Sequence, residues 1–160
     1  MRVPHRGRRG FTLIELLVVI AIIGILSTLA VVALNSARQR SRDAKRVSDI
    51  RQIQTSLELG YAEIGGYPSS PSPIVLGSAN YDVMCVNGGS VFQASTTGCS
   101  TMLMGLVPSN PTPNGADYLY TSATGSATYS ITFELEGQTG QLGAGPNCAN
   151  QNGIIAGSTC

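Results

Sequence analysis

The chain has 160 residues, which suits one domain plus an anchor, and its formal net charge is +1. All ten Lys and Arg residues lie at or before Arg51, whereas the segment after Arg51 carries only acidic charges. A segment without basic residues is not typical of a nucleic-acid-binding domain, so we expect no nucleic acid there. The single histidine, His5, excludes a Ser-His-Asp catalytic set from the rest of the chain.

Residues 1–10 are short and basic, like the positively charged start of a signal segment. An apolar run follows from Phe11 to about Leu34. As a helix with ~1.5 Å rise per residue it is roughly 35 Å long, enough to cross a bilayer core of about 30 Å. We therefore predict a membrane-spanning helix. An ordinary secretory signal would be cut after this run, where Thr28-Leu29-Ala30 is a poor cleavage site.

Glu15 is the one acid inside the apolar run. A carboxylate in hydrocarbon costs on the order of a few kcal/mol, and the helix macrodipole offsets only roughly 0.3–1 kcal/mol near an N-terminus. Two interpretations stay open: an acid tolerated near a helix end, or an acid that pairs with a cation from another chain. If the chain were cut after Gly10, the new α-amine of Phe11 would be such a cation.

The segment Arg8-Arg9-Gly10-Phe11-Thr12-Leu13-Ile14-Glu15-Leu16 resembles the processing site of type IV prepilins and type II secretion pseudopilins. The resemblance implies that a membrane prepilin peptidase cuts after Gly10 and N-methylates Phe11. It implies that Glu15 pairs with the amine of a neighbouring subunit in a homo-oligomeric filament. It also implies an assembly ATPase and a platform protein, and a precursor held once in the inner membrane with its head outside. The assembled filament would be periplasmic or extracellular.

Apolar residues continue at steps of mostly three and four over residues 35–64, which predicts an amphipathic second half of the helix. No proline occurs between Pro4 and Pro68. We therefore predict one helix from about Thr12 to Ile64 that ends at Gly65-Gly66. Many pilins have a proline in the apolar run, and this chain has none, which leaves local unwinding on assembly open.

The opposite face of the amphipathic half is charged. Its residues are Arg38, Arg42, Asp49, Arg51 and Glu58. Basic residues from Arg38 to Arg51 could form a phosphate-binding strip, but we interpret them as a solvated or inter-subunit face. The chain therefore has four predicted parts. These are a cleaved leader (1–10), an apolar assembly helix (11–34), an amphipathic helix (35–64) and a β-rich head (65–160).

Residues 65–80 are predicted to form an extended loop, because Gly65-Gly66 and three prolines break regular structure. The Tyr67-Pro68 pair resembles the helix end of major pseudopilins. A small hairpin is expected from residues 81–86 and 90–94 around Asn87-Gly88-Gly89. Residues 100–108 are expected to form a short helix with Ser100 as its N-cap.

The clearest strands are expected at residues 118–122 and 127–136, joined by a turn at residues 124–126. In the second strand, apolar residues from Tyr129 to Leu135 alternate with polar ones, which predicts a half-buried antiparallel strand. Its apolar face should pack on the amphipathic helix. The predicted class is α+β: a long N-terminal helix packed against a small antiparallel sheet, like the pilin lollipop.

Four cysteines, Cys85, Cys99, Cys148 and Cys160, allow three pairings or four free thiols. Neighbours in the sequence pair most simply, as Cys85–Cys99 and Cys148–Cys160. In the loop-entropy model each bond contributes on the order of 2–3 kcal/mol, and the second would hold an otherwise loose tail. Such bonds indicate an oxidising space outside the cytoplasm.

The resemblance raises the question of a calcium site in the loops after the strands. Residues 137–160 contain no acid, so Asp117 is the only nearby candidate, and we expect neither a metal nor a cofactor. Glu134 and Glu136 would lie about 7 Å apart at ~3.4 Å rise per strand residue, a separation similar to that of glycosidase carboxylates. We interpret them as solvent-facing acids and expect no enzymatic activity.

We expect a structural subunit of a type IV pilus-like filament, assembled through its N-terminal helix after leader cleavage. Two alternatives remain. One is a pseudopilin of a type II secretion system. The other is a minor pilin that acts in adhesion or DNA uptake.

Overall fold

The residues that the computed structural model describes are 10–87, 90–123, 125 and 127–160. The expected leader before Gly10 and parts of the two expected hairpin turns lie outside them. The chain divides into two compact units, the first ending at Arg38 and the second running from Gln39 to Cys160. The head and its core belong to the second unit.

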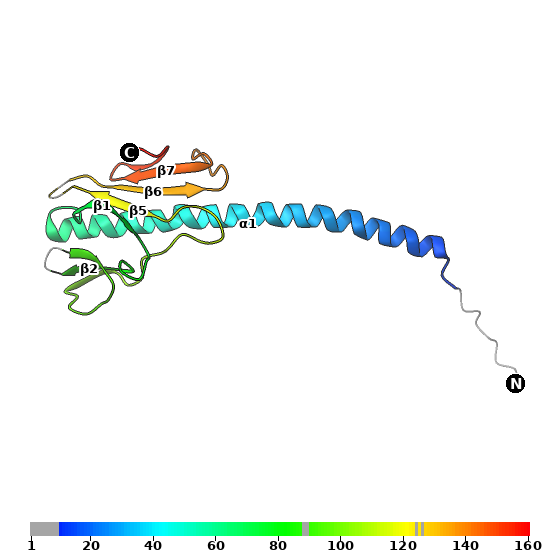
Figure 1. The fold of residues 1–160 in the computed structure, drawn as a ribbon, viewed down its shortest axis with the longest axis horizontal. Coiled ribbons are helices and arrows are strands. Elements are labelled where there is room, and N and C mark those ends of the chain that lie inside the picture. Colours follow the sequence, from blue (N-terminus) through cyan, green and yellow to red (C-terminus); the bar gives the residue numbers. More distant parts are fainter. Residues whose placement is uncertain (1–9, 88–89, 124, 126) are drawn as a thin grey trace, which may run out of the picture. The chain divides into compact units, whose positions relative to one another are not determined.

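Helix α1 runs from Leu13 to Ile64 and supplies residues to both units (Figure 1). It ends where Gly65 takes a φ of 74° and donates its N–H to the Tyr61 carbonyl at 2.8 Å. A glycine in this left-handed conformation is a common helix terminator because it has no Cβ to clash. The predicted single long helix is thus confirmed.

Two antiparallel sheets form the rest of the second unit. The larger has the order β1-β5-β6-β7-β8, with bounds Ser70–Val75, Leu119–Ser122, Ser130–Leu135, Gly145–Asn150 and Gly153–Ala156. The smaller has the order β3-β2-β4, with bounds Ser90–Gln93, Val83–Asn87 and Thr101–Met104. In Figure 1 strands β6 and β7 lie on one side of α1 and strand β2 lies on the other.

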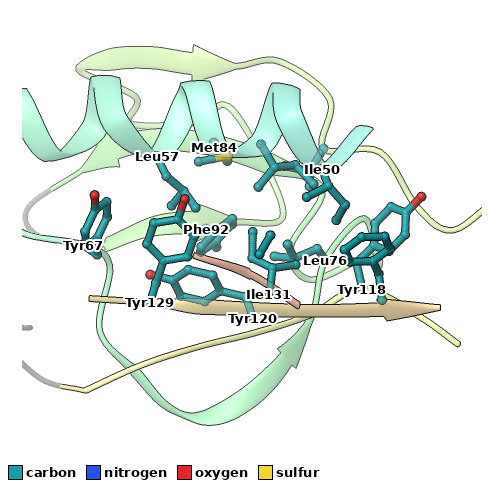
Figure 2. Packing of buried hydrophobic residues seen from close by; sticks show 14 of the residues in the cluster. Ile50, Leu57, Tyr67, Leu76, Met84, Phe92, Tyr118, Tyr120, Tyr129 and Ile131 are labelled. Carbon is teal, nitrogen blue, oxygen red and sulfur yellow. The ribbon is translucent and has the colours of Figure 1, made fainter. Parts of the chain in front are cut away.

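The core lies between α1 and the two sheets (Figure 2). The helix contributes Ile50, Ile53 and Leu57, which are fully buried and spaced three or four residues apart. Strand β6 buries alternate side chains, as its sequence pattern predicts, because neighbouring strand residues point to opposite faces. The sheets and the loop after α1 add an aromatic cluster: Tyr67, Phe92, Tyr120 and Tyr129.

The small sheet packs closely on α1 at Gly60. A Cβ placed on Gly60 would lie 2.9 Å from the Cδ1 of Leu103 in β4. The helix therefore has a glycine where the neighbouring strand packs on it, despite the low helix propensity of this residue.

The expected helix over residues 100–108 is wrong. Residues 101–104 form strand β4, which pairs with β2 and places Val86 opposite Thr101. Ser100 caps no helix, since both its backbone N–H and its hydroxyl donate to the Val86 carbonyl. Backbone pairing with a distant strand has overridden a short apolar run that is compatible with either structure.

Two segments expected to be irregular are strands. Strand β1 contains Pro71 and Pro73, but it lies at the sheet edge, where a missing N–H does not interrupt a central ladder. The tail expected to be loose forms the β7–β8 hairpin, and β7 pairs with β6 from Ile131 to Leu135.

Candidate functional site

The N-terminal half of α1 exposes an unbroken apolar surface. The large apolar side chains from Phe11 to Leu34 are 46–83% exposed. An 18-residue window of this helix has a mean hydropathy of 3.0, and none of the window is buried. Within the described residues α1 is the one helix that is long and apolar enough to cross a membrane. A contiguous apolar surface of this size requires lipid or protein to cover it.

Glu15 and Thr12 form a capping box at the start of α1. The Thr12 backbone N–H and hydroxyl both donate to Glu15 Oε2 at 2.9 Å. In return the Glu15 N–H donates to Thr12 Oγ1 at 3.2 Å. This exchange satisfies backbone donors that have no partner within a helix, and it fixes where the helix begins. The Thr-x-x-Glu spacing is visible in the sequence, although our sequence analysis did not use it.

The capping box uses one of the two carboxylate oxygens of Glu15. Both contacts use Oε2, and no hydrogen bond to Oε1 is found within the described chain. Gly10 and Phe11 precede the helix and are exposed, with 83% of Phe11 accessible. The peptide bond between them thus joins two exposed residues, and Thr12, which follows Phe11, bonds the Glu15 carboxylate.

A second charged cluster surrounds Arg46, which is fully buried in the head. Its Nη1 donates to Asp43 Oδ1 at 2.7 Å and to Glu136 Oε1 at 2.8 Å. Its remaining N–H groups bond the loop that precedes β5, at Asn110 Oδ1 and at the carbonyls of Pro111 and Asn114. Gly115 has a φ of 93°, and a Cβ there would lie 3.0 Å from Arg46 Nη2.

Arg42 completes the charge balance of this cluster. Its Nε and Nη2 bind the two oxygens of Glu136 at 2.7 and 2.6 Å. This two-pronged contact, with further hydrogen bonds from Asn114 and Arg46, lowers the pKa of Glu136. The hydrogen bond to Glu136 also raises the pKa of Arg42. Two cations thus face two carboxylates, Asp43 and Glu136.

The cluster joins three segments of the second unit. Asp43 accepts the backbone N–H groups of Glu136 and Gly137 at 2.9 Å each, so the end of β6 is tied to α1. Glu136 is therefore not the solvent-facing acid we expected, and Arg42 and Arg46 do not belong to a solvated face. Their partners lie about 90 residues away in the sequence, and only the fold brings them together.

Asp49 also departs from the expected charged outer face. It is 5% exposed, and its Oδ2 accepts the Tyr118 hydroxyl at 3.2 Å. Burial raises the pKa of Asp49, because the charged carboxylate is poorly solvated there. Burial and the nearby Asp49 charge raise the pKa of Tyr118.

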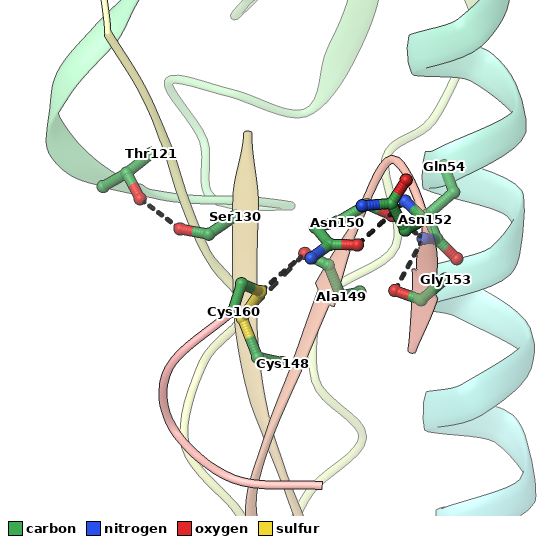
Figure 3. The surroundings of a disulfide bond; sticks show 9 residues. All are labelled: Gln54, Thr121, Ser130, Cys148, Ala149, Asn150, Asn152, Gly153 and Cys160. Atoms are coloured by element: carbon green, nitrogen blue, oxygen red, sulfur yellow. Dashed lines mark hydrogen bonds between the residues drawn. A yellow bond between two sulfur atoms is a disulfide. The ribbon is translucent and has the colours of Figure 1, made fainter. Parts of the chain in front are cut away.

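The cysteines form two disulfides between sequence neighbours, Cys85–Cys99 and Cys148–Cys160. The second joins β7 to the C-terminal residue (Figure 3). Close to it, Gln54 of α1 donates to the Asn150 carbonyl at 2.7 Å, which anchors the β7–β8 turn on the helix. The C-terminal segment is thus held by a covalent bond, by strand pairing and by the helix.

Asp117 lies exposed in the loop before β5. Across the part of the chain that the structure describes, no group of three or more His, Cys, Asp or Glu residues is arranged to hold a metal ion. Asp117 is therefore not part of such a group among the described residues.

Comparison with known proteins adds to this geometry. Residues 5–31 match the family described as the prokaryotic N-terminal methylation motif. Type II secretion system core protein G of Vibrio cholerae is 26% identical over 151 residues, which cover 92% of this chain and 94% of that protein. The chain is therefore similar to a type II secretion core protein over most of its length, and its N-terminal segment carries the methylation motif.

Two further relatives are more similar to this chain over a shorter stretch. Core protein G of Dickeya chrysanthemi is 37% identical over 66 residues, 41% of this chain and 43% of that protein. A fimbrial protein of Pseudomonas aeruginosa is 35% identical over 68 residues, 42% of this chain and 44% of that protein. The chain thus spans less than half the length of these two relatives. No solved structure matches it.

Proposed function

We propose that this chain is a structural subunit of a type IV pilus-like filament, assembled through its N-terminal helix after cleavage between Gly10 and Phe11. The observation that carries the proposal is the exposed apolar surface of residues 11–34 with a single carboxylate at its start. Such a surface needs lipid around it before assembly and other copies of the same helix afterwards. Lipid and a bundle of such helices are both apolar environments, so the same apolar segment can be buried in either.

Glu15 gives the assembled helices their register. Cleavage after Gly10 would leave a positively charged α-amine on Phe11, four residues from Glu15. At ~1.5 Å rise per residue, a neighbour displaced by about 6 Å along the helix axis brings its amine to the level of Glu15. Thr12 already holds one carboxylate oxygen in place, and the other can accept the amine. An unpaired charge in such a packed bundle would be strongly unfavourable, so the pair selects this displacement.

The partners follow from the same proposal. A prepilin peptidase removes the leader and N-methylates Phe11, and the precursor sits in the inner membrane with its head outside. An assembly ATPase and a platform protein move subunits from the bilayer into the filament. We propose no catalytic role, because Glu136 is held by Arg42 and Arg46 and so does not form a reactive pair with Glu134.

The first experiment determines the N-terminal residue of the mature chain. In cells with a prepilin peptidase, mass spectrometry of the purified chain should find an N-terminal Phe11 that carries a methyl group. A chain that still begins at Met1 in such cells would contradict the proposal.

The second experiment separates two roles of Glu15. E15A removes both the capping oxygen and the charge, whereas E15Q keeps an oxygen that accepts the Thr12 hydrogen bonds but is neutral. We expect both variants to insert in the membrane and both to lose filaments in electron micrographs. Normal filaments from E15Q alone would reduce Glu15 to a helix cap, and normal filaments from both would remove it from assembly.

A second candidate function, a pseudopilin of a type II secretion system, is favoured by the match to core protein G over nearly the full length of this chain. The two functions differ in what a deletion changes. Deleting the gene should abolish long surface filaments if the chain is a pilus subunit. It should instead trap normally secreted enzymes in the periplasm if the chain is a pseudopilin.

A further inference from the structure

The internal ion cluster leaves charges of opposite sign on different surfaces of the head unit. In this cluster Arg42 and Arg46 of the helix pair with Asp43 and Glu136. Arg40 and Arg51 are exposed, and in the described part of the chain neither forms a salt bridge.

The two free arginines mark one face of α1. The residues Arg40, Ala44, Val47 and Arg51 follow one another at steps of four, three and four, which places them on a single stripe. Beside this stripe lies an open groove of about 640 Å³, lined by Ala44, Val47, Arg51 and Gln54 of α1 and by Thr139, Gly140, Gln141, Leu142, Gly153 and Ile154. We call it the arginine groove. It lies at the edge of the large sheet that ends in β8. Arg40 lies on the same stripe, beyond the lining of the groove.

Arg51 forms no salt bridge with any residue that the structure describes. Glu58 lines a neighbouring depression with Arg51, but its Oε1 accepts the Tyr67 hydroxyl at 2.7 Å. The arginine groove therefore combines apolar and polar side chains with the cation of Arg51, and Arg40 adds a second exposed cation farther along the stripe.

An acidic face lies elsewhere on the same head. Asp117 is exposed, and Glu134 on β6 accepts the Ala116 N–H at 3.2 Å, so the two acids are neighbours. We call them the acidic face. Among the described residues neither of these two acids forms a salt bridge.

The arginine groove and the acidic face lie at the same level along α1. The Asn114 carbonyl bonds Arg46 and the Tyr118 hydroxyl bonds Asp49, so the segment carrying Asp117 runs beside helix residues 46–49. The groove is lined by α1 from Ala44 to Arg51. Parallel copies displaced by about 6 Å, roughly one helical turn, therefore keep one copy's groove level with the next copy's acids.

We propose that the arginine groove receives the acidic face of a second copy of this chain, with Arg40 and Arg51 pairing with Asp117 and Glu134. This inference rests on the proposed function, since it assumes parallel subunits. The two surfaces are different, so the contact is head-to-tail and repeats from copy to copy without closing on itself. Opposite charges favour this register over contacts that bring like charges together.

The test is a charge exchange in the full chain, expressed with a prepilin peptidase and a pilus assembly system, with sheared filaments quantified. R40E/R51E and D117R/E134R should each lower filament yield by about tenfold or more, because like charges then face each other. The combined variant, with all four changes, should recover most of the yield. If E134R prevents folding, the single exchange R51E/D117R gives the same comparison.

Lys45→Glu is the matched control. Lys45 is exposed on α1 but lies roughly 120–140° around the helix from Arg51 and Arg40, at 100° per residue. It makes the same charge change per substituted residue outside the groove, and filament yield should stay near that of the wild type. Thermal unfolding of each variant checks that the head remains folded.

The outcomes distinguish this inference from the proposed function. Wild-type filaments that persist in R40E/R51E, or a combined variant no better than the single-surface ones, would overturn the inference alone. An equal loss in Lys45→Glu would show a general charge requirement and would also overturn it. Absence of filaments from the wild-type chain under these conditions would overturn both.

Discussion

The two halves of α1 have the same backbone but opposite surroundings. Leu26 in the N-terminal half is 59% exposed, whereas Leu57 in the C-terminal half is fully buried beneath the two sheets. The second half buries its apolar face against the sheets of its own chain. The first half has no such cover, and its stability in water depends on lipid or on other copies. The contrast shows that the two halves of one helix can serve different purposes: the C-terminal half stabilises the fold, and the N-terminal half serves assembly.

The charges of the two halves follow the same division. Arg46 is buried with partners from its own head, so its pairing is complete in a single copy. Among the described residues Glu15 is bonded by Thr12, through one carboxylate oxygen, and the other oxygen remains for a partner. Changes in the second half should therefore alter folding, and changes in the first half should alter assembly.

The largest effect on folding is expected from Arg46→Met. It removes the cation between Asp43 and Glu136 and should lower the free energy of unfolding by about 3–5 kcal/mol, because buried carboxylates lose their partner. Urea unfolding of the full chain in detergent, followed by circular dichroism, measures this loss. Arg51→Met at the exposed groove is the control and should change the value by less than about 0.5 kcal/mol. Equal losses would mean that burial of the arginine does not matter.

A matched pair of leucines tests the division of the helix directly. L57A should cost about 2–5 kcal/mol of head stability, since it opens a cavity in the core. L26A should leave the unfolding of the head within about 0.5 kcal/mol of the wild type while reducing filament yield. Urea titrations measure head stability in both variants, and sheared-filament assays measure their filament yield. A destabilised head in L26A would show that the N-terminal half contributes to folding after all.

The disulfides should strengthen only the head. Replacing Cys148 and Cys160 by serine should lower head stability by about 2–3 kcal/mol, because the bond closes a short loop that the unfolded chain would otherwise leave open. Thermal unfolding with and without reductant measures this effect in the wild type as well. The double variant should no longer respond to reduction at this bond, and the helical signal from the membrane half should stay unchanged. Loss of that signal would show that the disulfide also stabilises the N-terminal half of α1.

The smallest effect is a difference in acid sensitivity. Arg42 and its neighbours lower the pKa of Glu136 from its ordinary value of 4.5, so the folded head holds this carboxylate charged more firmly than the unfolded chain does. Its contribution is present above that ordinary value and is lost as the pH falls below it. The raised pKa of Asp49 acts in the opposite direction, because protonation favours the folded form there.

The wild type should therefore lose more stability between pH 7 and pH 3 than E136Q, in which the Glu136 contribution is absent at both values. Melting temperatures at the two pH values measure the difference. E15Q is the matched control in the other half and should follow the wild type. An E136Q profile parallel to that of the wild type would show that Glu136 does not contribute to the acid response.

Much of this architecture can be read from local patterns. Apolar residues at helical spacing without proline indicated one long helix, and the alternation around Ile131 indicated a half-buried strand. Both patterns are long and regular enough to exclude other structures. The pairing of sequence neighbours among the cysteines followed from the simplest connection.

Other features were out of reach of local reasoning. Residues 101–104 are as compatible with a helix as with a strand, and only pairing with β2 decides between them. Pro71 and Pro73 suggested a loop, yet an edge position tolerates them in a strand. Arg42 and Glu136 each looked like a surface charge, since neither has a partner nearby in the sequence.

The sequence by itself determined the long helix, its apolar first half and the acid placed at its start, because helical spacing and hydrophobicity are properties of neighbouring residues. The tertiary structure alone decided which charges are buried, which strands pair and which arginines remain free for another molecule. Those outcomes depend on groups far apart in the chain, and their free energies arise only when folding brings the groups into contact.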